Sequence, residues 1–449
     1  MGKQEKRPAL SLATKMGLSL ICGLVAGVLL LFLRESLIGG GNEAVWKTIN
    51  DLFFQDITAQ GAEKALGIFY LIGQLFIRSL QLIIVPMVFT SITLAIGQIS
   101  DTRTLGRISA KTLVWFLICS FFALVLACSV GGALYNAGLF TAQVEGLSGN
   151  TGSTGSNPMN VILNMVPANI VTAFGSNTAV LAVVFLAVCL GLSMNALGQE
   201  KTATLRRLVQ ELNDVVVVFL NYVVNKFAPF AIFVLLVRTF ATYGIDYLRP
   251  AFAYVVTAVV LLLLYLVVGY PLIVAVGARK NPVTFLRKIS KVAVFGFSTS
   301  SSAAALPLNY KTCTEDLGVD EAIASFVLPL GMTINMNGTA IMHIIGAAFI
   351  ATCAGLEVTP MHYATMTLLA ICASMGTPAI PAAGTVMLYA VLTGAGFGTE
   401  LCTLIYSLIL AMNKPCEMVL TTLNVVGDAA TTVIVAKTEN EFDAKVYNS

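Results

Sequence analysis

Charged side chains are scarce in this sequence of 449 residues, of which aspartate, glutamate, lysine and arginine make up 11%. A soluble globular protein carries about 25% charged residues, so the composition excludes an ordinary soluble domain. Hydrophobic residues make up 57% of the chain. Several uncharged, mostly apolar runs reach the roughly 18 residues that cross a bilayer as a helix. The sequence therefore predicts an all-α integral membrane protein whose partner is the lipid bilayer.

Patterns for metal binding and disulfides are also missing. Two histidines are too few for a multi-histidine metal or haem site, and the 9 cysteines form no C-x-x-C pair. We interpret these cysteines as small packing residues in apolar helices. The net charge of +3 gives no indication of nucleic-acid binding, and none is expected. The last arginine is Arg287, and no lysine occurs between Lys311 and Lys414.

Basic residues gather in short connections, and their alternation predicts the topology. It predicts both termini in the cytoplasm of a multi-pass protein of the cell inner or plasma membrane. The glycine- and serine-rich connection 146–158 should lie outside the cell. The first six spans are expected at 16–33, within 66–100, after 111, at 161–198 as an interrupted pair, at 215–237 and at 251–277.

A polar stretch, T-I-N-M-N-G-T at 333–339, interrupts an apolar segment that runs from about 322 to 349. An unpaired amide or backbone group in hydrocarbon costs several kcal/mol, so such a stretch persists only inside protein or against a cavity. Polar residues at that depth indicate a functional site.

Two runs of small residues and prolines, at 297–307 and 374–385, each precede a span that contains N-x-x-G. Paired interruptions of this kind are typical of inverted-repeat transporters with a site near the membrane midplane. Each run is predicted to form the tip of a re-entrant hairpin, where helix N-termini offer N–H groups to an anion. In the final span, helical geometry places one polar stripe inside an apolar segment. That stripe consists of Lys414, Glu417, Leu420, Thr421, Asn424 and Asp428.

Taken together, these motifs resemble the dicarboxylate/amino acid:cation symporter family of the glutamate-transporter-homologue type. The resemblance covers nearly the whole chain and is strongest after residue 290. It implies eight transmembrane helices with two re-entrant helical hairpins, assembled as a homotrimer that works as an elevator. The implied divisions are scaffold helices at 1–100, a third span of the transport domain at 101–140, an outer linker with scaffold helices at 141–245, the rest of the transport domain at 246–437, and a cytoplasmic tail at 438–449.

The resemblance also implies the site residues. About two sodium ions would be transported per cycle, and each would bind to oxygen ligands, which hard cations prefer. The implied cation ligands are Gly331, Asn335, Asn424 and Asp428 at one site, and Thr333, Met336, Ser374, Met375 and Thr377 at the other. The implied substrate contacts are Ser300, Ser301, Ser302, Thr339, Ile380, Pro381, Gly384, Glu417, Leu420, Thr421 and Asn424.

The sequence departs from the family pattern at a third sodium site. That site needs an aspartate where this chain has Asn337, and a tyrosine and a threonine where it has Phe116 and Cys119, whereas Ser120 is retained. Without the carboxylate, nothing neutralises a buried cation. We predict that this third site is absent or weak.

A second departure concerns the substrate. Family members that carry acidic substrates have an arginine at the position of Leu420, and no arginine follows Arg287 here. Bidentate recognition of a second carboxylate is therefore unavailable. Glu417 keeps the negative charge that binds a substrate ammonium. We expect a sodium-coupled symporter for a neutral, small amino acid.

Several alternatives remain at this stage. Lys414 could pair with Glu417 and compromise the amine site. His343 either carries protons or is a satisfied core residue. The fold could carry an acidic amino acid, a dicarboxylate or another organic solute, or form a channel-like anion pore. An enzyme is not expected, because Gly296-Phe-Ser-Thr-Ser300 falls short of G-x-S-x-G.

Overall fold

The computed structural model describes residues 12–59, 61–97, 103–140, 163–177, 179–243 and 248–449. The basic start at 1–7 and the connection 146–158 lie outside the described residues. In the described part, the regular secondary structure is helical, apart from an isolated bridge between Val319 and Phe442. The all-helical class predicted from composition is therefore confirmed.

The helices of the first half are α1 (Leu12–Gly39), α2 (Glu43–Phe53), α3 (Ile68–Gly97), α4 (Arg103–Asn136), α6 (Ile170–Phe174), α7 (Val180–Leu197), α8 (Gln199–Tyr222), η1 (Val223–Phe227) and α9 (Ala228–Tyr243). Those of the second half are α10 (Leu248–Leu264), η2 (Tyr265–Gly269), α11 (Tyr270–Gly277), α12 (Pro282–Thr299), α13 (Ser302–Lys311), η3 (Thr312–Asp316), α14 (Glu321–Ile334), α15 (Asn337–Cys353), α16 (Pro360–Met375), α17 (Ala383–Gly394), α18 (Glu400–Met412), α19 (Lys414–Glu439) and α20 (Ala444–Asn448).

Within the described residues, 8 helical segments are long and apolar enough to cross a membrane. This agrees with the predicted number of spans. The third span, expected after residue 111, begins earlier in the structure, because α4 already starts at Arg103. Arg107 and Lys111 extend this helix beyond its apolar part and pair with Glu439 of α19, at N–O distances of 2.7 and 2.5 Å.

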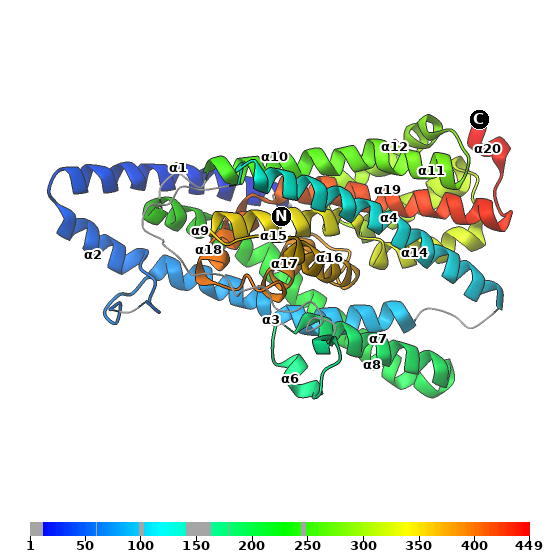
Figure 1. The fold of residues 1–449 in the computed structure, drawn as a ribbon, viewed down its shortest axis with the longest axis horizontal. Coiled ribbons are helices and arrows are strands. Elements are labelled where there is room, and N and C mark those ends of the chain that lie inside the picture. Colours follow the sequence, from blue (N-terminus) through cyan, green and yellow to red (C-terminus); the bar gives the residue numbers. More distant parts are fainter. Residues whose placement is uncertain (1–11, 60, 98–102, 141–162, 178, 244–247) are drawn as a thin grey trace, which may run out of the picture.

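The helices pack in two groups that run roughly along the long axis of the molecule (Figure 1). In the first group, α1 packs on α9, and α3 packs on α7, α8 and α9. In the second group, α15 and α19 are surrounded by α4, α10, α12, α14 and α16. Burial singles out two segments of the second group: 100% of the most apolar window of Glu321–Cys353 and 94% of that of Lys414–Glu439 are buried, against 61% or less for the other spans of the described residues. The core of the protein therefore lies around the polar-interrupted helices.

Two helix pairs of the second group turn back sharply, at the places where the small-residue runs occur. The α12–α13 pair turns at Ser300, which adopts a left-handed conformation with φ of 50°. The α16–α17 pair turns at 376–382 and ends with Ala382 at φ of 67°. The two turns touch, because the Ala379 carbonyl accepts hydrogen bonds from Ser301 Oγ at 2.9 Å and Ala303 N at 3.3 Å.

The segment predicted as a tail packs against the base of the α12–α13 pair. The Tyr447 side chain is fully buried, and its hydroxyl donates to the carbonyl of Asn281 at 2.9 Å. Lys288 donates to the carbonyls of Asp316 and Val446. This end of the chain therefore holds the helix pair from the side opposite its turn.

Candidate cation and substrate site

The break between α14 and α15 brings a carboxylate to unsatisfied helix ends. α14 ends at Ile334 and α15 begins at Asn337, so the residues between them leave carbonyls without helical partners. Asp428 of α19 lies there with its side chain 2% exposed, and Asn335 Nδ2 donates to Asp428 Oδ1 at 3.0 Å. A buried carboxylate next to free carbonyls is an arrangement that suits a hard cation.

Asn424 ties the same place to the start of α15. Its side-chain oxygen accepts a hydrogen bond from Gly338 N at 2.8 Å, and its amide nitrogen donates to Thr339 Oγ1 at 3.3 Å. The structure therefore brings together Asn335 at the end of α14 with Asn424 and Asp428 of α19, the residues that the resemblance implies for one cation site. The assignment of these residues as cation ligands stays a prediction.

Glycines make room for this arrangement. A Cβ on Gly331 would lie 2.5 Å from Asp428 Oδ1, which is far inside van der Waals contact. A Cβ on Gly427 would overlap the hydroxyl of Tyr270. Both positions therefore require glycine for close approach of the helices, not for an unusual φ.

The first prediction follows from this fit: Gly331→Ala should weaken sodium binding at least about tenfold, because the added methyl must displace the Asp428 carboxylate. Sodium titration of the melting temperature measures the effect. Gly132→Ala, on α4 where a Cβ meets nothing within 4 Å, is the matched control and should leave the titration unchanged. An unaltered sodium affinity in Gly331→Ala would contradict a cation at Asp428.

The second predicted cation site lies where α14 and α16 approach each other. Ser374, Met375 and Thr377 form the end of α16 and the turn after it, and Thr333 and Met336 flank the α14–α15 break. The hydroxyls of Thr333, Ser374 and Thr377 all donate to carbonyls of their own helices, leaving oxygen lone pairs free to accept. Two interrupted helix ends thus meet there, and their role in binding stays a prediction.

At the position of the family's third sodium site, a neutral network surrounds Asn337. Its amide nitrogen donates to Tyr270 Oη and Asn335 Oδ1, both at 2.9 Å, and its oxygen accepts from Ser120 Oγ at 2.6 Å. Phe116 and Cys119 are buried beside it. The amide therefore satisfies these groups without a cation. That the third sodium site is absent or weak stays a prediction.

The predicted substrate residues converge on the space between the two turns and α19. Thr339 lies against Gly384 and accepts from the Asn424 amide, and Ser300 accepts from Lys414 next to Glu417. Ile380 and Pro381 belong to the turn after α16, and the role of all these residues in binding stays a prediction. Ser301 is the exception, because its hydroxyl already donates to Ala379 and caps α13 by accepting from Ala304 N. We therefore expect Ser301 to hold the two turns together rather than to contact a solute through its hydroxyl.

Glu417 is held by residues that the sequence did not single out. Thr385 Oγ1 donates to Glu417 Oε1 at 2.6 Å, and Asn413 Nδ2 donates to Thr385 Oγ1 at 2.7 Å. Tyr254 Oη in turn donates to Asn413 Oδ1 at 2.7 Å. Thr385 is the last residue of the second small-residue run, so the sequence already placed it in a predicted turn of the site. Nothing in the sequence indicated Tyr254. The question of Lys414 is answered in favour of pairing, with an Nζ–Oε2 distance of 3.8 Å to Glu417.

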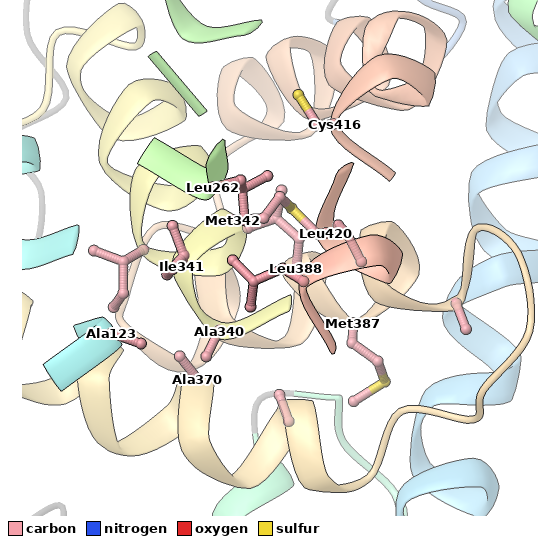
Figure 2. Close-up of a cluster of buried hydrophobic side chains, with 14 of the residues drawn as sticks. Ala123, Leu262, Ala340, Ile341, Met342, Ala370, Met387, Leu388, Cys416 and Leu420 are labelled. Carbon is pink, nitrogen blue, oxygen red and sulfur yellow. The ribbon is translucent and has the colours of Figure 1, made fainter. Parts of the chain in front are cut away.

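Leu420 forms an apolar wall. Figure 2 shows it close to Met342 and Leu388 within the cluster of buried hydrophobic side chains. The start of α15 packs tightly on it, since a Cβ on Gly338 would lie 2.7 Å from the Leu420 carbonyl oxygen. This wall offers no hydrogen-bond donor to a second carboxylate.

His343 is fully buried in α15, and its Nε2 lies 2.8 Å from the carbonyl oxygen of Gly384. A carbonyl accepts only, so Nε2 carries a proton and Nδ1, which has no partner among the described residues, needs none in the neutral tautomer. This geometry favours the interpretation of His343 as a core residue that fixes the start of α17.

Interrupted helices, a buried carboxylate and hydroxyl-rich turns in the core of a helical membrane protein define a secondary transporter. The profile of the sodium:dicarboxylate symporter family matches residues 12–438. Similar proteins include the excitatory amino acid transporter of Caenorhabditis elegans, 28% identical over 80% of this chain and 78% of that protein, and the proton/glutamate-aspartate symporter of Escherichia coli (strain K12), 28% identical over 83% and 86%. The proton/sodium-glutamate symport protein of Bacillus caldotenax is 26% identical over 83% and 88%.

The chain belongs to the sodium:dicarboxylate symporter family. It is a multi-pass membrane protein and an ion-coupled symporter of the glutamate transporter family, not an enzyme. The family predicted from the two small-residue runs, the 333–339 stretch and the polar stripe that ends at Asp428 is confirmed.

Proposed function

We propose that the protein couples inward sodium movement to the uptake of a neutral, small amino acid. The observation that carries the proposal is that the carboxylate of Glu417 and the apolar side chain of Leu420 are both buried and lie one helical turn apart on α19. Glu417 can bind the ammonium of an amino acid in place of Lys414, whose ammonium lies 3.8 Å from Oε2, beyond hydrogen-bond distance. The wall at Leu420 leaves a charged side chain of the solute without a partner. An unpaired buried charge costs several kcal/mol, which disfavours glutamate, aspartate and dicarboxylates.

Sodium coupling would follow from the α14–α15 break. A cation at Asp428 would fix Asn335 and Asn424, whose side chains contact the start of α15 and so Thr339 of the substrate space. Ordering these groups lowers the cost of binding the solute. By linkage, sodium should tighten solute binding, and the solute should tighten sodium binding by the same factor.

The driving force is sufficient for concentrative uptake. One charge that moves through 100 mV releases about 2.3 kcal/mol, so two sodium ions with a zwitterion release roughly 4–5 kcal/mol from voltage. At about 1.4 kcal/mol per tenfold change, this sustains accumulation on the order of a thousandfold.

For the movement itself we propose an elevator in a homotrimer. In this scheme the α12–α13 and α16–α17 pairs are re-entrant hairpins and move with α4, α10, α14, α15 and α19 past a scaffold of α1, α3, α7, α8 and α9. The packing supports this division, because α1, α3, α7, α8 and α9 contact one another more extensively than they contact the helices of the second group. The end of the chain, packed on the base of α12, would travel with the moving part. Both termini are proposed to be cytoplasmic, in the plasma or inner membrane.

Uptake into proteoliposomes with an inward sodium gradient tests the function. We expect an uncharged amino acid such as L-alanine or L-serine to be taken up fastest from a panel that also contains L-aspartate, L-glutamate and succinate. Uptake should saturate and show counter-exchange, which a pore would not. If L-glutamate or L-aspartate is preferred, the argument from Leu420 is wrong. If no solute responds to sodium, the proposed function fails as a whole.

A further inference from the structure

Lys414 places a positive charge next to the carboxylate of the substrate space. It is the first residue of α19, and its ammonium donates to Ser300 Oγ at 3.0 Å and lies 3.8 Å from Glu417 Oε2. Its side chain is 18% exposed, so both charges are largely removed from solvent. Lys414 thereby connects the turn of the α12–α13 pair to α19.

The surroundings of this pair are apolar on the scaffold side. Glu417 and Lys414 line a small cavity whose opposite wall includes Phe76 and Leu80 of α3 and Ile232 of α9. These side chains offer a carboxylate no hydrogen bond and no counter-charge. Apart from the Thr385 hydroxyl, which donates to Glu417 Oε1, a carboxylate that moved along such a wall would have no partner to compensate for its lost hydration.

A lysine in the same chain segment differs from a transported cation because it cannot leave. A solute ammonium or a sodium ion neutralises Glu417 only while it is bound. Lys414 stays within one helical turn of Glu417 at every stage of transport. Its ammonium is a compact point charge without the planar fork of arginine, so it suits a counter-ion better than bidentate carboxylate recognition.

We propose that Lys414, from its position between Ser300 and Glu417, is the resident counter-ion of Glu417 and allows the solute-free carrier to return across the membrane without an external cation. The inference rests on the proposed function, since it concerns the return half of that cycle. It makes Lys414 a positioning residue for charge, with no contact to the solute required. With the charge of Glu417 cancelled, Asp428 is the carboxylate that sodium must neutralise.

Two transport modes separate this role from a general defect. Net uptake of L-alanine and L-serine requires the return of the empty carrier, whereas exchange of labelled for unlabelled amino acid does not. Lys414→Met should lower net uptake about tenfold or more and leave exchange within about twofold, because the uncompensated charge costs at least about 1.4 kcal/mol in the return step alone. Potassium inside the vesicles should restore net uptake by substituting for the ammonium.

Lys226→Met is the matched control, since Lys226 is an exposed lysine in η1 of the scaffold. It should leave both modes and their potassium response unchanged. Equal loss of exchange and net uptake in Lys414→Met, without rescue by potassium, would overturn the inference. So would a variant that keeps L-alanine transport and loses only competition by L-aspartate, because Lys414 would then bind a solute carboxylate.

A second measurement needs no solute. The melting temperature of Lys414→Met should rise when choline is replaced by potassium, and that of Lys414→Met/Glu417→Gln should not, because the double variant has no unpaired carboxylate. If both respond alike, Lys414 does not neutralise Glu417. If the unmodified protein transports no amino acid at all, the proposed function fails, and this thermal comparison still decides the charge pairing.

Discussion

Asp428→Asn should abolish sodium-dependent uptake and sodium-dependent thermal stabilisation. The substitution keeps the shape of the side chain and its contact with Asn335 but removes the charge. Two unit charges about 4 Å apart attract each other by about 4 kcal/mol at an effective dielectric constant of 20. This corresponds to a loss of roughly a thousandfold in sodium affinity.

Sodium titrations of the melting temperature and of uptake provide the measurement, with Glu439→Gln as the control. Glu439 is a buried carboxylate of the same helix that pairs with Arg107 and Lys111 instead of facing the α14–α15 break. Its loss should lower stability but leave the sodium midpoint in place. A sodium response that survived in Asp428→Asn would show that the cation binds elsewhere.

The second large effect is expected for Asn337→Asp. A carboxylate here would face Ser120, Tyr270 and Asn335 with no basic side chain among these partners. Without a cation it should destabilise the protein by about 3–5 kcal/mol. Sodium should reverse the loss by binding to the new carboxylate, so the melting temperature becomes strongly sodium-dependent.

Measured in choline and then in sodium, the melting temperatures of Asn337→Asp and Asn337→Ser distinguish charge from lost hydrogen bonds. Only the aspartate variant should recover in sodium, and its sodium-to-solute ratio should increase by about one ion. If the ratio and the sodium response match those of the unmodified protein, the amide of Asn337 is not what prevents binding of a third ion.

The sequence predicted the parts of this protein that depend on local chemistry. The break at 333–339 and the turn around Ser300 could be predicted because polar and glycine residues interrupt apolar runs there. Such interruptions cost free energy in lipid unless the protein pairs the exposed polar groups. The face of α19 that carries Glu417 and Asp428 followed from helical geometry alone. The start of α4 was missed because charged residues can continue a helix beyond its apolar part.

Contacts between distant segments could not be predicted in the same way. Tyr254 reaches Glu417 through Asn413 and Thr385, and these four residues come from four different helices or connections. Nothing in the spacing of a tyrosine within an apolar span identifies its partner. The partner of Lys414 could not be predicted either. The structure shows its ammonium next to both Glu417, three residues later in the same helix, and Ser300, more than a hundred residues earlier.

The carbonyl of Ala379 accepts hydrogen bonds from both Ser301 and Ala303 and so joins the turn of the α16–α17 pair to that of the α12–α13 pair. Because the acceptor is a main-chain carbonyl, the distance between the two turns at this contact does not depend on the side chain at residue 379. Replacing a side chain that lines the site, such as the leucine at 420, then changes the polarity of the lining without changing the distance between the two turns. A change of the transported solute therefore requires the substitution of only a few side chains, while the backbone contact between the two turns is kept.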